Sequence, residues 1–308
     1  PYVATAQSAK DYPSKPIQFV APLPAGGSTD VLMRDVARRL QERWGQPAIV
    51  ENKPGGAGSI GTAPVARAAP DGYTLLLVNS GHAINGHVYP KLPFDPMKDF
   101  VPVVHMTSLA LGLFVHPSVP AKTLSEFIAL AKAKPGALSF ASSGNGGATH
   151  LAGESFTLAT GIKMVHVPYR GSAPAIADVV AGHVPVSFAD LPLAAPHFKS
   201  GALRPLAVSS TARSPMMPAV PTFDEAGLPG RPSSVWVGIL APANTPPDIV
   251  QKLNREIVAI LREPAMTARL VEQGFEVIAG TPEQFGQLMK ADYERFGITV
   301  RNAGIKLD

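Results

Sequence analysis

Two stretches rich in glycine and hydroxyl side chains each lie between a predicted strand and a predicted helix. In the first, the apolar run 17–21 predicts a buried strand, residues 22–30 read PLPAGGSTD, and apolar side chains recur at helical spacing from Leu32 to Trp44. The first amides of a helix have no partner within it, and they lie at the positive end of the helix dipole. A turn of this kind therefore favours an anion, with Ser28 or Thr29 as the helix N-cap.

The second stretch repeats this arrangement far along the chain. Residues 138–141 predict a short strand, residues 142–150 read SSGNGGATH, and a helical pattern from Leu151 ends at Gly161. The plain alternative for each stretch is a capped helix that binds nothing. If the two stretches face each other across a cleft, they can hold a small anion from both sides. The residues that we predict as ligand contacts are Ala25, Gly26, Gly27, Ser28 and Thr29 in the first stretch and Ser142, Ser143, Asn145, Gly147, Ala148 and Thr149 in the second.

Ser80 and His82 are further candidates, because they follow the apolar strand predicted at residues 73–78. In open α/β sheets, ligands bind outside the carboxyl ends of the strands. Both side chains are therefore predicted ligand contacts. For His82, a solvent-facing or structural role is the alternative.

Arg170 and Asp190 also stand at the carboxyl ends of predicted strands, at residues 163–169 and 184–189. A guanidinium group matches a carboxylate with two parallel hydrogen bonds, so Arg170 is the candidate for direct pairing with a carboxylate. Asp190 would either orient Arg170 or accept a hydrogen bond from the ligand. A structural ion pair between the two is the alternative.

Composition limits the classes of function. The 308 residues suit about two domains, and the central apolar run 109–115 is too short to span a bilayer. The chain has no cysteine, and its eight histidines show no pair at metal-ligand spacing, so we expect no metal and no cofactor. The net charge is +4, but basic residues are scattered beside acidic ones, which argues against nucleic acid and favours the approach of small anions. Residues 4–6 resemble the end of a signal peptide already removed, which indicates export.

Glycines at 56, 58 and 61 match the dinucleotide-binding spacing literally. That fingerprint needs an acidic residue about 20 positions further on to hold a ribose, and residues 72–94 contain neither Asp nor Glu. We therefore predict a flexible turn that lines the same cleft, followed by a helix from about Thr62 to Ala69.

A serine-type hydrolase is the alternative function. His150 begins a predicted helix and could meet Ser142 or Ser143, which would allow the 142–150 loop to act on a small carboxylate ester. The sequence has no Gly-x-Ser-x-Gly elbow and no evident third member of a triad. A binding protein needs no reactive group, and we predict that the chain is not an enzyme.

Several short motifs, taken together, resemble a known family. The chain resembles the periplasmic solute-binding proteins of tripartite tricarboxylate transporters, the Bug-type receptors, over nearly all of residues 14–306. The matching segments are YPxxPI at 12–17, PAGGxxD at 24–30, VENKPGG at 50–56, PDGYTL at 70–75, VPYRG at 167–171, LAV at 206–208, PTxxEAG at 221–227 and LAPAxTP at 240–246.

The resemblance implies a two-lobed α/β fold like the type II periplasmic binding proteins, each lobe a mixed sheet flanked by helices, joined by two crossing strands. Lobe one would comprise residues 1–108 and 236–308 and lobe two residues 109–235, with the ligand cleft between them. The resemblance also implies a periplasmic receptor that closes around a small carboxylate and delivers it to membrane permease subunits. We expect a monomer that binds no nucleic acid.

The resemblance leaves the ligand open among aliphatic di- and tricarboxylates, aromatic acids, nicotinate and acidic amino acids. In the family, the first glycine loop holds a carboxylate, often through ordered water, which implies a role for residues 25–29. The negative charge of Asp30 would repel an anion bound nearby, so we expect its side chain to face the helix or to bond a backbone amide. A free Arg170 favours a dicarboxylate, and the small side chains of the second loop leave room for an aromatic one. An acidic amino acid would instead use Asp190 for its ammonium group.

Overall fold

The computed structural model describes residues 11–23, 25–89, 91–229 and 234–305, so the predicted signal-peptide remnant at residues 4–6 lies outside the described residues. The chain divides into two compact units. Unit 1 comprises Pro1–Thr107, Trp236–Leu270 and Val277–Glu294, and unit 2 comprises Ser108–Val235, Val271–Glu276 and Arg295–Asp308. The chain enters unit 2 within strand β4 (Phe100–Leu109) and returns at the start of strand β10 (Val235–Pro242).

These bounds differ from the expected lobes in two late segments, 271–276 and 295–308, which group with unit 2. Helix α10 (Pro282–Asn302) is continuous across the second of these boundaries. Near its end, Thr299 Oγ1 lies 3.1 Å from the Ser155 hydroxyl of unit 2. A contact of this kind depends on the folded helix and leaves no local signal in the sequence.

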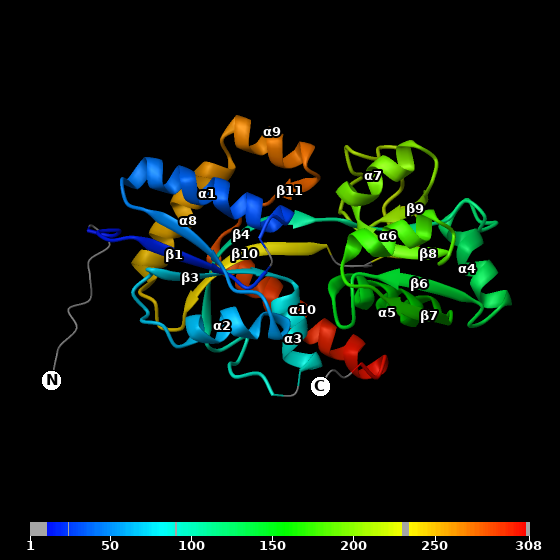
Figure 1. Ribbon diagram of the computed structural model, residues 1–308, viewed down its shortest axis with the longest axis horizontal. Helices are drawn as coiled ribbons and strands as arrows, with labels where there is room; N and C mark the ends of the chain where they lie inside the picture. The colour runs from blue at the N-terminus through cyan, green and yellow to red at the C-terminus, as the bar shows by residue number, and fades with distance from the viewer. Residues whose placement is uncertain (1–10, 24, 90, 230–233, 306–308) are drawn as a thin grey trace. The chain divides into compact units, whose positions relative to one another are not determined.

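Unit 1 is built on a six-stranded sheet in the order β11-β4-β10-β3-β1-β2 (Figure 1). Strand β1 pairs in parallel with β2 and β3, while β10 pairs antiparallel with β3. The loops that follow β1, β2 and β3 therefore emerge at one edge of the sheet, where ligands bind in open α/β sheets. The remaining bounds are β1 Ile17–Ala21, β2 Ala48–Asn52, β3 Thr74–Asn79, β11 Phe275–Val277, α1 Ser28–Trp44, η1 Gly56–Gly58, α2 Ser59–Ala66, α3 Gly81–Val88, α8 Pro247–Leu261 and α9 Pro264–Glu272.

Unit 2 is built on a five-stranded sheet in the order β7-β6-β8-β5-β9. Strands β7 and β8 both run parallel to β6, so the loops after these three strands share one edge, while β5 runs antiparallel to β8 and β9. The bounds are β5 Leu111–Val115, β6 Leu138–Ser142, β7 Met164–Pro168, β8 Val186–Asp190, β9 Arg204–Val208, α4 Leu124–Ala133, α5 Ala148–Thr160, α6 Ser172–Val180 and α7 Leu191–Lys199.

The second sheet is covered on both faces. Successive side chains of a strand point to opposite faces, and neighbours on β6 accordingly enter different cores. Phe140 packs in a cluster with Phe156 of α5, and Ala141 packs in another with Ile176 of α6. Figure 1 shows α5 on one side of this sheet and α6 with α7 on the other. This layering fixes where α5 and α6 begin, which is at the sheet edge that carries the second glycine loop.

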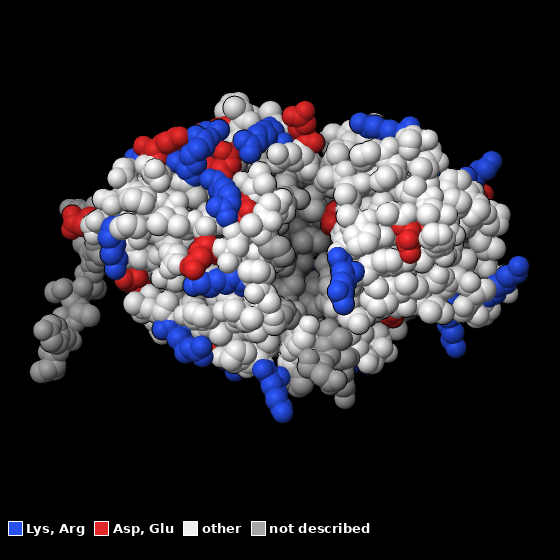
Figure 2. All heavy atoms as spheres, in the orientation of Figure 1, with Lys and Arg blue, Asp and Glu red and all other residues white. Residues whose placement is uncertain are grey.

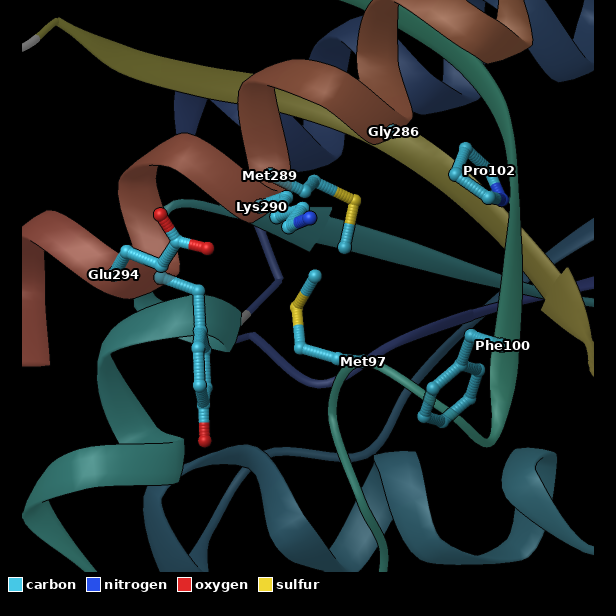
Figure 3. A pocket seen from close by; sticks show the side chains of 8 residues that line it. Met97, Phe100, Pro102, Gly286, Met289, Lys290 and Glu294 are labelled. Atoms are coloured by element: carbon cyan, nitrogen blue, oxygen red, sulfur yellow. The ribbon is translucent and has the colours of Figure 1, made fainter.

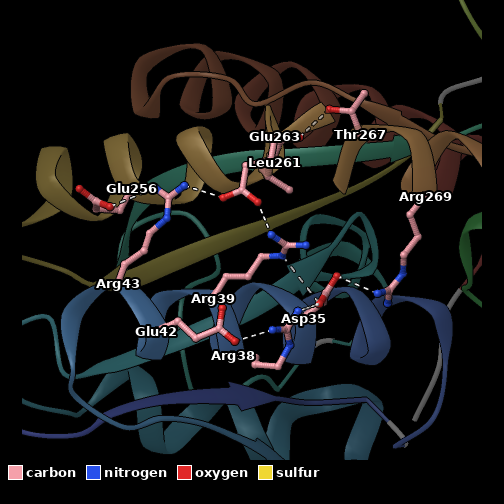
Figure 4. A network of polar contacts seen from close by, with 10 residues as sticks. All are labelled: Asp35, Arg38, Arg39, Glu42, Arg43, Glu256, Leu261, Glu263, Thr267 and Arg269. Carbon is pink, nitrogen blue, oxygen red and sulfur yellow. Dashed lines mark hydrogen bonds and ion pairs between the residues drawn. The ribbon is translucent and has the colours of Figure 1, made fainter. Parts of the chain in front are cut away.

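Charged side chains hold α1 against α8 and α9 in unit 1 (Figure 4). Arg39 and Arg43 both pair with Glu263, and Arg269 lies 3.1 Å from the buried carboxylate of Asp35. On the face shown in Figure 2, basic side chains over this region stand beside acidic ones.

No described helix is both long and apolar enough to cross a membrane.

Candidate ligand-binding site

The first glycine loop follows β1 and is held by the carboxylate of Asp30. One oxygen of Asp30 accepts hydrogen bonds from the Gly26 amide at 2.9 Å and from Arg34 Nε at 3.0 Å, and the other accepts one from Asn52 Nδ2 at 2.9 Å. Burial alone would raise the pKa of this carboxyl, but the three donors hold it below its ordinary value. Asp30 therefore bonds a backbone amide, as expected, and the Gly26 amide is no longer available to a ligand.

The cap of α1 differs from the prediction. Gly27, with φ −71° and ψ 162°, occupies the N-cap position and no side chain caps the helix. The prediction of Ser28 or Thr29 as N-cap is wrong, because the extended Gly27 lets the helix begin at Ser28. The amides of Ser28 and Thr29 belong to the first turn, whose N–H groups have no acceptor within a helix. These amides, beside the exposed Ala25, are what the first loop offers to an anion.

The end of β3 and the loop after β2 lie at the same sheet edge. The Ser80 hydroxyl is buried and is without a hydrogen-bond partner among the described residues. A buried polar group of this kind costs free energy until a ligand or a water bonds it. At Gly61, an added Cβ would approach Lys53 O to 2.8 Å and Pro22 Cα to 3.1 Å, so the absent side chain lets the segment after β2 contact the first loop.

His82 is turned into unit 1. Its Nε2 lies 2.9 Å from Pro96 O, and its ring stacks 6.0 Å from Phe94 and meets the Phe100 ring edge-on at 5.3 Å. Burial lowers the pKa of the ring to about 4, although the bond to Pro96 opposes this. The imidazole is therefore neutral at pH 7 and we assign it a structural role, which was the alternative to ligand contact.

A pocket of about 550 Å³ lies between α10 and the start of β4 in unit 1 (Figure 3). None of the predicted contact residues lines it. Its walls are mainly apolar, with the charged side chains of α10 near them: Met97, Phe100, Pro102, Gly286, Met289, Lys290, Tyr293 and Glu294.

In unit 2, most amides of the second glycine loop donate hydrogen bonds to acceptors in the loop itself and in the first turn of α5. Thr149 Oγ1 accepts the Ser143 amide at 2.8 Å, the Ser142 hydroxyl accepts the Gly144 amide at 3.2 Å, and His150 Nδ1 accepts the Gly146 amide at 3.0 Å. These three amides are therefore not available to a ligand. The donors that remain are those of the first turn of α5, after its N-cap Gly147.

The main-chain donors that this part of unit 2 leaves unbonded are therefore at the helix start. These are the amides of Ala148, Thr149 and His150, while the Thr149 side chain is used to shape the loop. Asn145 is exposed and makes no hydrogen bond within the described part of the chain. Its amide side chain remains available to a ligand.

Arg170 is held beside the second loop by its neighbours. The amide of Tyr169 donates to Ser142 O at 3.0 Å and the amide of Gly171 donates to Ser143 O at 3.1 Å. Arg170 stands between these two residues in the chain. Its guanidinium group is exposed and forms no ion pair with any described residue. The alternative of a structural ion pair with Asp190 is therefore not observed.

Asp190 is the last residue of β8 and occupies the N-cap position of α7, but its side chain makes no hydrogen bond to that helix. Its carboxyl accepts a hydrogen bond from the Ser172 hydroxyl at 3.2 Å, and Ser172 begins α6 directly after the Arg170–Gly171 turn. Burial raises the pKa of Asp190 above its ordinary value, and the bond from Ser172 only partly offsets this. The structure thus brings Arg170 and Asp190 to the sheet edge that carries the second loop.

The geometry expected for a hydrolase is absent from the described residues. The Ser142 hydroxyl is fully buried and lies 2.6 Å from Nε2 of His166, and Ser143 bonds Thr149. The prediction that His150 meets one of these serines is wrong, because its Nδ1 faces the Gly146 amide. His166, a histidine within β7, had no distinguishing signal in the sequence. The described part of the chain also holds no group of three or more His, Cys, Asp or Glu that could bind a metal ion.

Comparisons with known proteins agree on one family. The model of the family described as "Tripartite tricarboxylate transporter family receptor" matches residues 32–305. The protein BugT of Bordetella pertussis is 39% identical over 307 residues, which cover 99% of this chain and 94% of BugT.

Two solved structures with carboxylates are also similar. A protein of R. palustris described with adipate is 35% identical, with a TM-score of 0.82, and the match covers 96% of this chain and 100% of that one. The protein MatC of Rhodopseudomonas palustris, described with bound malate, is 31% identical with a TM-score of 0.78, and the match covers 94% of this chain and 100% of MatC.

Proposed function

Because the chain belongs to the tripartite tricarboxylate transporter receptor family, a family of periplasmic solute-binding receptors and not of enzymes, we propose that its ligand is a small dicarboxylate. Each unit offers a group of atoms suited to a carboxylate. In unit 1 these are the first-turn amides of α1 and the Ser80 hydroxyl, and in unit 2 they are the first-turn amides of α5 and the Arg170 guanidinium group. The partner to which the receptor delivers the ligand would be the membrane permease of such a transporter.

The observation that carries this proposal is the guanidinium group of Arg170, which is exposed and forms no ion pair with a described residue, in a turn that bonds the second loop. A guanidinium group and the first-turn amides of a helix are two kinds of donor for a carboxylate, and both favour a negative charge. Asp30, the one carboxylate of the first loop, is bonded by three donors, and one of them, the Arg34 guanidinium group, offsets its negative charge. Adipate and malate, described with two relatives, are both dicarboxylates.

Asp190 bears on the choice between a dicarboxylate and an acidic amino acid. Its raised pKa means that burial disfavours its ionised form, and a ligand ammonium group would restore that form. An acidic amino acid would therefore lower the pKa of Asp190 on binding, whereas a dicarboxylate would raise it further.

A thermal-shift panel tests the ligand class. It should contain adipate, malate, succinate, citrate, a phthalate, nicotinate, aspartate and glutamate. A ligand present at about 100 times its Kd adds about 2.7 kcal/mol to the free energy of unfolding, which gives a clear rise in Tm. We expect the largest rise with an aliphatic dicarboxylate. A panel in which no carboxylate changes the Tm would contradict the proposal, and a response to aspartate alone would replace the dicarboxylate with an amino acid.

A further inference from the structure

Asn52 is the last residue of β2, the strand at one end of the unit 1 sheet. In the parallel ladder it is paired with Ala21, the last residue of β1, so it lies beside the point where the first glycine loop begins. Its side chain is partly buried, and the ligand contacts proposed above do not include it. The polar group at this position therefore needs a separate explanation.

The amide group of Asn52 donates and accepts hydrogen bonds at the same time. Its Nδ2 donates to Leu23 O at 3.1 Å and to Asp30 Oδ1 at 2.9 Å, and its Oδ1 accepts a hydrogen bond from Arg34 Nη2 at 2.6 Å. A main-chain carbonyl and an ionised carboxylate can only accept, and a guanidinium group can only donate, so these three partners fix the orientation of the amide. A carboxylate at this position would lack both donors.

These bonds join the two ends of the first loop. Leu23 lies just after β1, and Asp30 lies in the first turn of α1. Between them, the Gly26 amide donates to the other oxygen of Asp30 at 2.9 Å. The amides proposed as donors at the start of α1 thus belong to the segment between two residues that the Asn52 side chain holds.

The chain after Asn52 supports only the beginning of this loop. The Lys53 amide donates to Ala21 O at 2.8 Å, and an added Cβ at Gly58 would lie 3.4 Å from Pro22 Cβ. These contacts are made at Ala21 and Pro22, whereas the Asn52 side chain reaches further, to the first turn of α1. The loss of Asn52 would therefore leave β2 beside the loop but separate it from the helix.

Asn52 is not itself suited to bind a carboxylate. Both hydrogens of its Nδ2 are used, and the lone pair that remains on Oδ1 is an acceptor, which a carboxylate would repel. Any effect of Asn52 on ligand affinity must therefore act through the loop.

We propose that Asn52 is the positioning residue of the first glycine loop: its bonds to Leu23 and Asp30 keep the amides at the start of α1 in the arrangement that binds a ligand carboxylate. Without these bonds the loop adopts other arrangements, and the apparent affinity falls with the fraction of molecules in which the loop is competent to bind. The effect on the ligand rests on the function proposed above, whereas the effect on the loop does not.

Two variants remove the donated bonds by different means. Asn52→Ala removes the whole amide group. Asn52→Asp keeps the shape and the acceptor for Arg34, but it loses both donors and places a second carboxylate beside Asp30, where like charges repel. The two variants together separate the loss of the bonds from the loss of the side chain.

Asn254→Ala is the matched control within unit 1. The Asn254 amide also donates two hydrogen bonds, to Val103 O at 2.9 Å and to Gly280 O at 3.0 Å, and neither acceptor belongs to the first loop. Its removal should lower the Tm, as that of Asn52 does, without changing the affinity for a ligand. The control therefore separates a positioning role from a general loss of stability.

Isothermal titration with adipate at neutral pH, well below the Tm of every variant, gives the first readout. Losing two hydrogen bonds should weaken adipate binding about five- to a hundredfold in Asn52→Ala, and at least as much in Asn52→Asp. Asn254→Ala should bind adipate as tightly as the native chain. Native affinity in both Asn52 variants would overturn the proposal, and so would an equal loss in Asn254→Ala.

The second readout needs no ligand. The ¹H–¹⁵N shift and the hydrogen exchange of the Gly26 amide report on its bond to Asp30. Both should change in Asn52→Ala and stay native in Asn254→Ala. A Gly26 amide that is unchanged in both Asn52 variants would overturn the proposal, even if adipate binds. If adipate binds to none of the chains while Gly26 responds to the loss of Asn52, the positioning role stands and the carboxylate function fails for this ligand.

Discussion

Arg170 is the residue whose removal should change ligand affinity most. Its guanidinium group has no ion pair with a described residue, so a substitution there removes a ligand contact and disturbs little else. Arg170→Ala should weaken a bound dicarboxylate by about 1.5–3 kcal/mol, the range for a hydrogen bond to a charged group. Arg170→Lys should recover part of this, because an ammonium group keeps the charge but loses the paired geometry.

Isothermal titration of these variants with the ligand found in the panel checks the prediction. Arg213→Ala is the matched control, because Arg213 is another exposed arginine of unit 2 and pairs with Glu225 at 2.8 Å. The control should bind as the native chain does. Native affinity in Arg170→Ala would show that the guanidinium group makes no ligand contact.

Asp190 gives a prediction about stability without ligand. Its pKa is raised in the folded chain, so between its ordinary value of 3.8 and the raised value the folded state binds more protons than the unfolded one. Stability contributed by this group is present at low pH and is lost as the pH rises through that window. Asp190→Asn, which still accepts the Ser172 hydroxyl, should therefore raise the Tm at pH 7 and change it little near pH 4.

Scanning calorimetry of the ligand-free protein at the two pH values provides the measurement. Asp178→Asn is the comparison, because the pKa of Asp178 is shifted in the opposite direction: hydrogen bonds from Tyr169 and His183 hold it below its ordinary value. It should not raise the Tm at pH 7. A drop in Tm for Asp190→Asn at pH 7 would contradict the account of that side chain.

At the scale of single elements, the glycine at position 61 fixes how the loop after β2 meets the first loop. Gly61→Ala places a methyl group 2.8 Å from Lys53 O and 3.1 Å from Pro22 Cα, where main-chain atoms must move. We expect a loss of about 1–3 kcal/mol in the free energy of unfolding, as for other overpacked sites. Gly286→Ala is the control within α10, where the added atom meets only Pro102 Cγ at 3.4 Å. Urea unfolding measures the free energy of unfolding of both variants. A Gly61→Ala variant as stable as Gly286→Ala would contradict the close approach of main-chain atoms at Gly61.

Local patterns predict elements well where a strand is followed by a capped helix. The strand predicted at 17–21 forms. Residues 123–126 and 281–284 have the capping-box pattern, a Thr followed three residues later by Glu or Gln; Thr123 accordingly caps α4, and Thr281 and Gln284 bond each other at the start of α10. The same capping motif at Thr222 forms its bonds with Glu225 around a turn and begins no helix. A cap fixes a turn, and only the residues after it decide whether a helix follows.

Other elements could not be predicted from local patterns. Helix α7 contains Pro196 in its interior, which favours a break, and it forms because buried Leu191, Ala194 and Ala195 pack in one core. Strand β11, at Phe275–Val277, is too short to show alternation. The bonds that occupy the loop amides come from Thr149 and His150, whose side chains reach back only once α5 has formed.

At the scale of the whole molecule, buried neutral histidines set the response to acid. Burial is the main cause that lowers the pKa of His82, His105 and His166 to about 4. Between about pH 6.5 and that value the unfolded chain binds more protons, so stability is present above pH 6.5 and is lost as the pH falls towards 4. We expect the Tm to fall steadily over this window. A Tm that stays constant between pH 6.5 and pH 4 would contradict the neutral state of these rings.

The donors at the starts of α1 and α5 are proposed to bind the carboxylates of the ligand. A crystal structure of the protein grown with adipate, or with the best ligand of the panel, tests this central claim most directly. We predict a ligand carboxylate within hydrogen-bond distance of the first-turn amides of α5, or of those of α1. A ligand bound elsewhere, in contact with neither helix start, would contradict the claim.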